Sequence, residues 1–326
     1  MTAPSIHRAR RQATALVGLL AVCSTLVACG ADSSIAEEDQ PILTEKSVVA
    51  VWKDYDKRNN AALVKTGPPS YDSTAFEVAD IGPILDQDVT SVQLDEIDRG
   101  KRGKPFSHTP RTLYAPAKDA GFALSTLVTS RDKDKANESL TSILPVGDPV
   151  TWKMEMSVQV PRKDLPRPLE PGLRSTASKA DVERAGEVVT SISEYWRTHR
   201  KPTGIALAGA TYADWVKSHA EFSKSKYDVS SEAVPEGIPT TPGAGKALRV
   251  VRAKGGLLVL VTVRVRNIIE SREKGITVNW KGIPGKLYGT KPAKRTWAQW
   301  SASLAISVPD KGRPTVLGGT YVPLVH

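Results

Sequence analysis

The stretches Trp152–Val160 (WKMEMSVQV) and Trp300–Val308 (WSASLAISV) follow one pattern. In each, a tryptophan opens an alternation of apolar side chains with polar or small ones, and a proline follows the last apolar residue. Side chains of a β-strand point alternately to the two faces of a sheet, so a period of two predicts a strand with one buried face. We therefore expect two such strands, 148 residues apart.

Helix and hairpin patterns also recur between the two halves of the chain. An amphipathic helix is predicted from about Pro41 to Lys65, and a second one after the cap residues Ser178 and Asp181. A strand, a glycine turn and another strand are predicted around Gly121 and again around Gly256. The apolar residues that carry these patterns are Val48, Val49, Trp52, Tyr55, Leu113 and Phe122–Val128, then Val188, Val189, Ile192, Tyr195, Leu248 and Leu257–Val263. A duplication accounts for this recurrence, and chance similarity of generic patterns is the alternative.

Helices that precede runs of strands predict an α+β fold, with helices packed on a curved antiparallel sheet, rather than alternating βαβ units. The length of 326 residues favours two domains. We place them at residues 41–170 and 171–326, because the proline-rich stretch Val160–Gly172 has the composition of a linker. A second such stretch, Pro235–Gly245, is expected to be a loop inside the second half.

Halves of this size and element order resemble the cone-shaped domains of the nuclear transport factor 2-like superfamily, which has a cystatin-like fold. The resemblance implies a short second helix in each half, at Ser73–Asp80 and from Thr211 to about Ser223. The chain also resembles uncharacterised two-domain lipoproteins of actinobacteria. That family implies no functional residues.

The first thirty residues predict export. The basic segment His7–Arg11 precedes the mostly apolar segment Ala13–Val27, which is the layout of a secretory signal peptide over residues 1–28. The apolar segment is shorter than the ~20 residues that a membrane-spanning helix needs.

The end of this signal resembles the lipobox of bacterial lipoproteins. The motif is Leu26–Cys29 followed by Gly30. The resemblance implies cleavage between Ala28 and Cys29, lipidation of Cys29, and a location at the extracytoplasmic face of the cell membrane. The alternative is an ordinary secretory peptide with a cysteine near the cleavage point.

Cysteine usage fits the lipobox interpretation. Cys23 lies inside the signal and Cys29 at its end, so the exported part has no further thiol for a disulfide or a zinc site. Residues 29–40 contain four acids and no base, and we expect them to form a flexible tether.

The formal net charge of +10 is unevenly distributed. Residues 41–176 carry 19 bases and 19 acids, whereas residues 177–326 carry 23 bases and 12 acids. Export argues against nucleic acid as a partner, so anionic lipid or an anionic wall polymer is the expected surface for the basic second half. The alternative is a solvated basic face without a partner. The sequence indicates no protein partner.

Motifs of known chemistry are incomplete. The strings Ser130–Lys133 and Ser223–Lys226 have the Ser-x-x-Lys form, but the triplet Lys65-Thr66-Gly67 precedes them, whereas penicillin-recognising enzymes place it after them. The segment Gly243–Lys246 lacks the other residues of a phosphate loop. No cofactor or metal is predicted, because no two histidines of the exported part lie at helical or hairpin spacing. These histidines are His108, His199, His219 and His326.

Three residues of the predicted second helix in the second half are weak catalytic candidates. They are Tyr212, Asp214 and His219. A carboxylate or imidazole in an apolar pocket has its pKa moved toward neutrality, which suits general acid or base catalysis. The alternative is that these residues have only structural roles, with Asp214 as a helix cap, Tyr212 as a core residue and His219 as a residue on the helix flank.

The expected function is a lipid-anchored, non-catalytic binding or accessory module at the cell envelope. One alternative is an enzyme of the isomerase or dehydratase type, with a pocket in one cone. A polar-lined pocket holding a carboxylate or histidine would favour that alternative, and cones filled by their own aromatic side chains would disfavour it. A second alternative is a solute-binding lipoprotein of a transporter, for which two βαβ lobes are expected.

Overall fold

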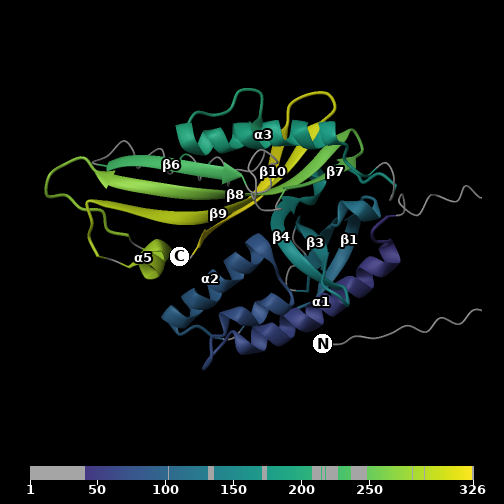
Figure 1. Cartoon of the computed structure of the whole chain (residues 1–326), viewed down its shortest axis with the longest axis horizontal. Coiled ribbons are helices and arrows are strands. Elements are labelled where there is room, and N and C mark those ends of the chain that lie inside the picture. Colours follow the sequence, from purple (N-terminus) through teal and green to yellow (C-terminus); the bar gives the residue numbers. More distant parts are fainter. Residues whose placement is uncertain are drawn as a thin grey trace, which may run out of the picture. The chain divides into compact units, whose positions relative to one another are not determined.

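The computed structural model describes residues 41–101, 103–130, 136–170, 175–207, 214, 217, 227–235, 248–280, 282–289 and 291–324, all of which belong to one compact unit of residues 36–326. The unit is an α+β fold with two curved sheets (Figure 1). The helices are α1 (Glu45–Lys65), α2 (Gly82–Asp98), α3 (Lys179–Thr198) and α5 (Gly282–Tyr288), with 3₁₀ helices η2 (Ser73–Val78), η3 (Lys118–Ala120) and η4 (Arg162–Asp164). The strands are β1 (His108–Tyr114), β2 (Ala123–Thr129), β3 (Asn137–Val146), β4 (Thr151–Pro161), β5 (Ala206–Leu207), β6 (Tyr227–Pro235), β7 (Leu248–Ala253), β8 (Gly256–Ser271), β9 (Arg295–Pro309) and β10 (Thr315–Leu324).

Capping boxes begin the two long helices α1 and α3. Thr44 Oγ1 accepts the backbone N–H of Ser47 at 3.2 Å, and Ser178 Oγ accepts the backbone N–H of Asp181 at 3.2 Å. The side chains of Ser47 and Asp181 in turn accept the backbone N–H groups of the caps, at 2.8 and 3.0 Å. The predicted cap of the second helix is confirmed, whereas the first helix begins at Glu45 and not at the predicted proline.

The two sheets have different strand orders. The first is the antiparallel meander β1-β2-β3-β4, and Gly121, at φ +69°, takes the left-handed conformation predicted for the turn before β2. The second has the order β5-β10-β9-β8-β6, with β7 also paired to β8 and a parallel contact between β5 and β10. Strands β8 and β9 pair without a register shift from Gly256–Pro309 to Glu270–Arg295.

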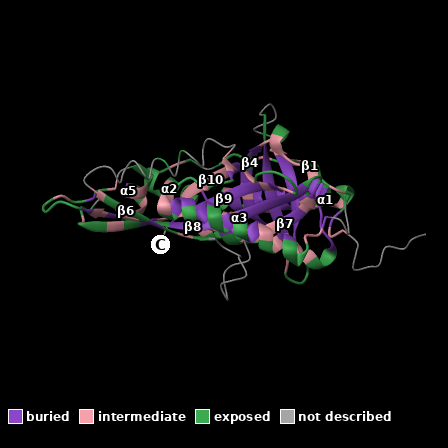
Figure 2. Ribbon diagram, turned by 90° about the horizontal axis from the view of Figure 1, so that it is seen from above, coloured by how far each residue is buried: buried purple, intermediate pink, exposed green. Residues whose placement is uncertain are grey.

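Packing produces four layers, in the order α1, the four-stranded sheet, the six-stranded sheet and α3. The apolar face of α1 covers one face of the first sheet, and α3 covers the outer face of the second. Buried side chains of both sheets meet between them, including Leu140, Met156, Leu258 and Leu260. Figure 2 shows buried residues concentrated where β4, β8 and β9 overlap, and more exposed residues along β6 and α5.

The prediction of a single buried face is wrong for β9. All residues from Ser301 to Ile306 are buried in this strand. The reason is a second covering layer, since β9 contacts β4 and α2 on the face opposite to α3.

The same prediction is wrong for β4, because the strand contains a bulge. The pairing of β4 with β3 shifts between Ser142 and Ile143, which leaves Glu155 as the extra residue. A bulge reverses the alternation of side chains. Met154 therefore packs toward α1 while Met156 packs against the second sheet.

Polar contacts and close backbone packing also join the two sheets. Arg249 of β7 donates two hydrogen bonds to Glu155, at 2.6 and 2.7 Å, and both side chains are buried or nearly so. Gly318 of β10 lies so close to β4 that a Cβ atom would come within 2.2 Å of the carbonyl oxygen of Gln159. The four-stranded sheet precedes residue 170 and the six-stranded sheet follows it, and the division into two domains stays a prediction.

The predicted linker is attached to both sheets. Tyr114 Oη donates to the carbonyl oxygen of Pro166 at 2.6 Å, and the backbone N–H of Lys254 donates to the carbonyl oxygen of Arg167 at 2.8 Å. The segment therefore contacts strands of both sheets.

The helices after α1 differ from the prediction. The expected helix at Ser73–Asp80 is the 3₁₀ helix η2, which ends at Val78. The longer α2 was not predicted, since it buries polar residues such as Gln87 and Thr90 and has no clear apolar stripe. The helix expected from Thr211 to Ser223 lies almost entirely outside the described residues. None of the helices in the described ranges is both long and apolar enough to cross a bilayer.

Candidate functional site

A cavity of about 260 Å³ lies between the helices and the four-stranded sheet of the first half. Polar groups that can bind or exchange protons are prominent in its wall, among them Tyr55 of α1, Asp88 of α2 and His108 of β1. The remaining wall is formed by Asn59, Leu63, Phe76, Ile84, Phe106, Thr129, Ser139, Met154 and Ser157.

Backbone pairing fixes Asp80 beside this wall. The backbone N–H of Ile81 donates to the carbonyl oxygen of Met154 at 2.9 Å, and the backbone N–H of Met154 donates to that of Ala79 at 3.0 Å. Asp80 forms a parallel bridge with Met154 and is 1% exposed. Tyr55 Oη donates a hydrogen bond to Asp80 Oδ1 at 2.8 Å.

Asp80 and Asp88 form a carboxyl pair. The two side chains lie close enough for the negative charge of Asp80 to raise the pKa of Asp88. Within the described part of the chain, no fixed donor contacts Asp80 Oδ2. Asp88 is half-buried and lines the cavity, so it connects the buried Asp80 to the cavity.

Burial sets the protonation of this pair. It raises the pKa of Asp80 to about 6, although the Tyr55 hydroxyl, the neighbouring Asp88 carboxyl group and the nearby Arg58 act to lower it. Burial, followed by the negative charge of Asp80, raises the pKa of Asp88 well above its usual range. Burial and Asp80 also raise the pKa of Tyr55. Both carboxyl groups therefore hold a proton more strongly than they would in water.

A histidine–aspartate pair stands next to the carboxyl pair. His108 Nδ1 lies 2.6 Å from Asp56 Oδ1, and the backbone N–H of His108 donates to Asp56 Oδ2 at 2.8 Å. The His108 ring packs among Trp52, Tyr55 and Phe106, with ring centroids 5.2, 5.6 and 5.1 Å away. Because Asp56 engages Nδ1, Nε2 is the ring nitrogen left to interact with a ligand.

This arrangement can bind a small molecule and exchange protons with it. It places the Asp88 carboxyl group, the Tyr55 phenol and the His108 imidazole around one cavity. Small-molecule pockets usually enclose ~300–1,000 Å³, and a cavity of about 260 Å³ lies just below that range, so it suits a very small ligand.

Most of the site residues named from sequence lie outside the described residues. These are Tyr212 and His219 among the catalytic candidates, and Ala28 and Cys29 at the lipobox. Asp214 is described and is exposed. The grouping of the three catalytic candidates therefore stays a prediction.

Sequence reasoning missed the cavity residues of the first half. One signal was present, because Trp52, Asp56 and Asn59 follow Val48 at helical spacing and place polar side chains on an apolar helix face. All four of these side chains are buried in α1. No comparable signal marks Asp80 or Asp88. Asp80 precedes α2 and Asp88 lies on it, and this helix was not predicted.

The interior of the second half differs, because aromatic side chains occupy the space between α3 and the sheet. Trp196 stacks on Tyr321 at 5.0 Å, and Tyr321 stacks on Trp300 at 4.5 Å. Among the described residues of the whole chain, no three His, Cys, Asp or Glu side chains are grouped to hold a metal ion.

The fold and the site define an α+β protein with an acidic cavity in its first half. Residues 39–326 match the family described as "Domain of unknown function (DUF8094)", and the chain belongs to this family. No curated protein matches the chain. The family match covers both sheets and the cavity, and it assigns no activity to them.

Proposed function

We propose that this chain is an exported, lipid-anchored protein whose first half binds a small polar ligand in the acidic cavity. The observation that carries the proposal is the buried carboxyl group of Asp80, whose Oδ2 has no hydrogen-bond partner among the described residues. A buried charge is costly unless it is paired, so a ligand with an ammonium or hydroxyl group would complement it. His108 and Tyr55 would then contact the polar remainder of the ligand.

Calorimetric titration of the full chain in detergent with ethanolamine, choline and putrescine tests this binding. We expect at least one of these amines to bind at pH 7.5, and to bind at least tenfold more weakly at pH 5, where Asp80 takes up a proton. Asp88→Asn should also weaken binding, whereas Asp119→Asn, at an exposed position on η3, should not. Failure of all three amines to bind, or equal binding by the Asp88→Asn variant, would refute the proposal.

The anchor is part of the same proposal and rests on the Leu26–Cys29 motif. Two acyl chains give stable membrane attachment where one chain is marginal. We expect Cys29→Ser to move the protein from the membrane fraction to the soluble fraction of an expressing bacterium. Retention of this variant in the membrane would argue against lipidation as the anchor.

The excess charge of residues 177–326, with 23 bases against 12 acids, supports contact with an anionic envelope surface. Each basic residue near an anionic membrane contributes ~1 kcal/mol at low salt, and salt screens this contribution. The full chain with Cys29→Ser should therefore bind vesicles containing 30% phosphatidylglycerol at low salt and leave them at 0.5 M salt. Salt-insensitive or absent binding would oppose this role.

A second candidate function is proton-transfer catalysis of the isomerase or dehydratase type. The specific observation is that two carboxyl groups with raised pKa, Asp80 and Asp88, lie at one cavity, which suits general acid and base catalysis. Such an enzyme would exchange protons next to a carbonyl group. Deuterium incorporation into dihydroxyacetone in D₂O, abolished by Asp88→Asn, would support it, and incorporation at the buffer rate would oppose it.

The nuclear transport factor 2-like resemblance is kept as a proposal for the first half. Helix α1, the short η2 and α2 pack on a curved sheet around a cavity, as the cone-shaped domains would require. The second half has a six-stranded sheet with the short parallel strand β5, and the rings of Trp196, Tyr321 and Trp300 stack beside α3.

A further inference from the structure

The inner face of the six-stranded sheet extends beyond the layer that covers it. Leu258 and Leu260 of β8 are buried against the four-stranded sheet. Arg264 and Arg266 continue the same face of β8, because side chains alternate along a strand. They lie where β8 pairs with β6, and Arg266 is 45% exposed at its side chain.

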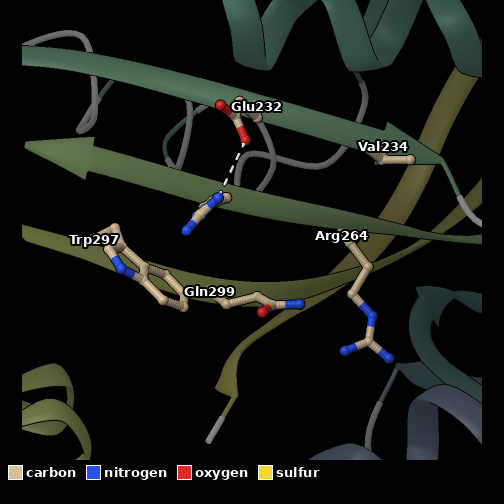
Figure 3. A pocket seen from close by; sticks show the side chains of 6 residues that line it. Glu232, Val234, Arg264, Trp297 and Gln299 are labelled. Atoms are coloured by element: carbon tan, nitrogen blue, oxygen red, sulfur yellow. Dashed lines mark ion pairs between the residues drawn. The ribbon is translucent and has the colours of Figure 1, made fainter. Parts of the chain in front are cut away.

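A pocket of about 350 Å³ occupies this uncovered part of the sheet (Figure 3). Neighbouring strands supply its walls, with Glu232 and Val234 from β6, Arg264 and Arg266 from β8, and Trp297 and Gln299 from β9. Strand register fixes these side chains: Glu232 lies opposite Arg266, which lies opposite Gln299. The pocket is therefore built on paired strands rather than on loops.

The aromatic and charged groups of this pocket are arranged for hydrogen bonding. The guanidinium of Arg266 lies 4.2 Å from the centre of the Trp297 ring. Stacking on a ring leaves the N–H groups at the guanidinium edge able to donate. Glu232 lies 3.9 Å from Arg266 and is 60% exposed, so it offers acceptors beside those donors. Trp297 is 37% exposed, which leaves part of a large apolar ring in water.

Carboxylates balance the charge of the pocket. Arg264 forms an ion pair with Asp86 of α2, and Arg266 has Glu232 beside it. The four groups carry no net charge in their ordinary ionised forms. A polyanion would meet two carboxylates here, whereas a neutral ligand with many hydroxyl groups would find donors, acceptors and a ring.

We propose that this pocket binds a neutral saccharide. The exposed part of the Trp297 ring would pack against the C–H face of a sugar ring, while Arg266 and Glu232 bind neighbouring hydroxyls as donor and acceptor. The Gln299 amide, which can both donate and accept, would bind a third polar group. This site lies on the second half, on different residues from the acidic cavity, and goes beyond the function proposed above.

Calorimetric titration with cellotetraose, maltotetraose and chitotetraose tests the proposal. The protein should be the full chain in a zwitterionic detergent, because common maltoside detergents are themselves sugars. We expect at least one oligosaccharide to bind, and Trp297→Ala and Glu232→Gln each to weaken it at least tenfold. Trp297→Phe keeps an aromatic ring and should retain binding within about fivefold.

Arg272→Gln provides the matched control. Arg272 is also an exposed arginine beside the sheet, and it pairs with Asp228 outside this pocket. It should leave sugar binding unchanged, while Arg266→Gln should reduce it at least tenfold. Asp88→Asn should also leave it unchanged, which separates this proposal from that of the acidic cavity. Absence of binding by all three oligosaccharides overturns the inference. So does binding of tetragalacturonate alone, lost equally in Arg266→Gln and Arg272→Gln, since that indicates ion exchange.

Discussion

Replacing Asp80 by asparagine should make the protein more stable at neutral pH, although it removes a buried hydrogen-bonded residue. The pKa of Asp80 is raised from 3.8 to about 6 in the folded protein, mainly by burial. The native state then binds the proton more strongly than the unfolded state does. The free energy of unfolding therefore falls as the pH rises from about 4 to about 6, and it keeps this lower value at higher pH.

The size of this effect follows from the two pKa values. At ~1.4 kcal/mol per pKa unit, the difference amounts to about 3 kcal/mol at pH 7.5. An asparagine has no proton to lose, and its amide oxygen can accept the Tyr55 hydroxyl as Asp80 Oδ1 does. Asp80→Asn should thus gain about 3 kcal/mol relative to the native chain between pH 4 and pH 7.5.

Urea unfolding of both proteins at pH 4, 5.5 and 7.5 measures this difference. Asp119→Asn on η3 is the control, because its side chain is exposed. The control should follow the native chain at every pH. If Asp80→Asn has the same stability difference from the native chain at pH 4 and at pH 7.5, the argument that burial raises the Asp80 pKa is refuted.

Three further substitutions test the packing, each measured by urea unfolding at pH 7.5. Arg249→Met should lose about 3–5 kcal/mol because it leaves Glu155 buried without its cation, and adding Glu155→Met should recover most of that loss. Gly318→Ala should lose about 1–3 kcal/mol or more, since its Cβ would meet the Gln159 carbonyl oxygen at 2.2 Å. Gly186→Ala should instead gain about 0.5–1 kcal/mol, because it lies within α3 and its Cβ would meet nothing within 4 Å. Unchanged or increased stability of Gly318→Ala would contradict the packing described between β4 and β10.

Local patterns predicted much of the secondary structure, because the relevant forces act over a few residues. The Ser178–Asp181 capping box and the turn at Gly121 depend on neighbours in sequence, and both occur as expected. The bulge at Glu155 could not be predicted in this way. It is stabilised by Arg249, 94 residues further along the chain.

The cavity was hidden from sequence reasoning for a similar reason. Asp80 is buried only because η2 ends beside β4, and its pKa depends on Tyr55 and Asp88 from two different helices. No spacing rule joins residues brought together by three elements. The prediction instead favoured Tyr212, Asp214 and His219, which are neighbours in sequence on one expected helix.

The core between the two sheets has a consequence for how this protein unfolds and how it can be divided. Four side chains of this core are fully buried between the two sheets. They are Met156 and Val158 from the first half and Leu258 and Leu260 from the second. Exposing such side chains costs ~1.5–3 kcal/mol each. We therefore expect residues 36–326 to unfold in one cooperative transition. Either half produced alone would expose the apolar face that the other half covers, and we expect it to aggregate through that face. The family match also runs from residue 39 to residue 326 without a break between the halves.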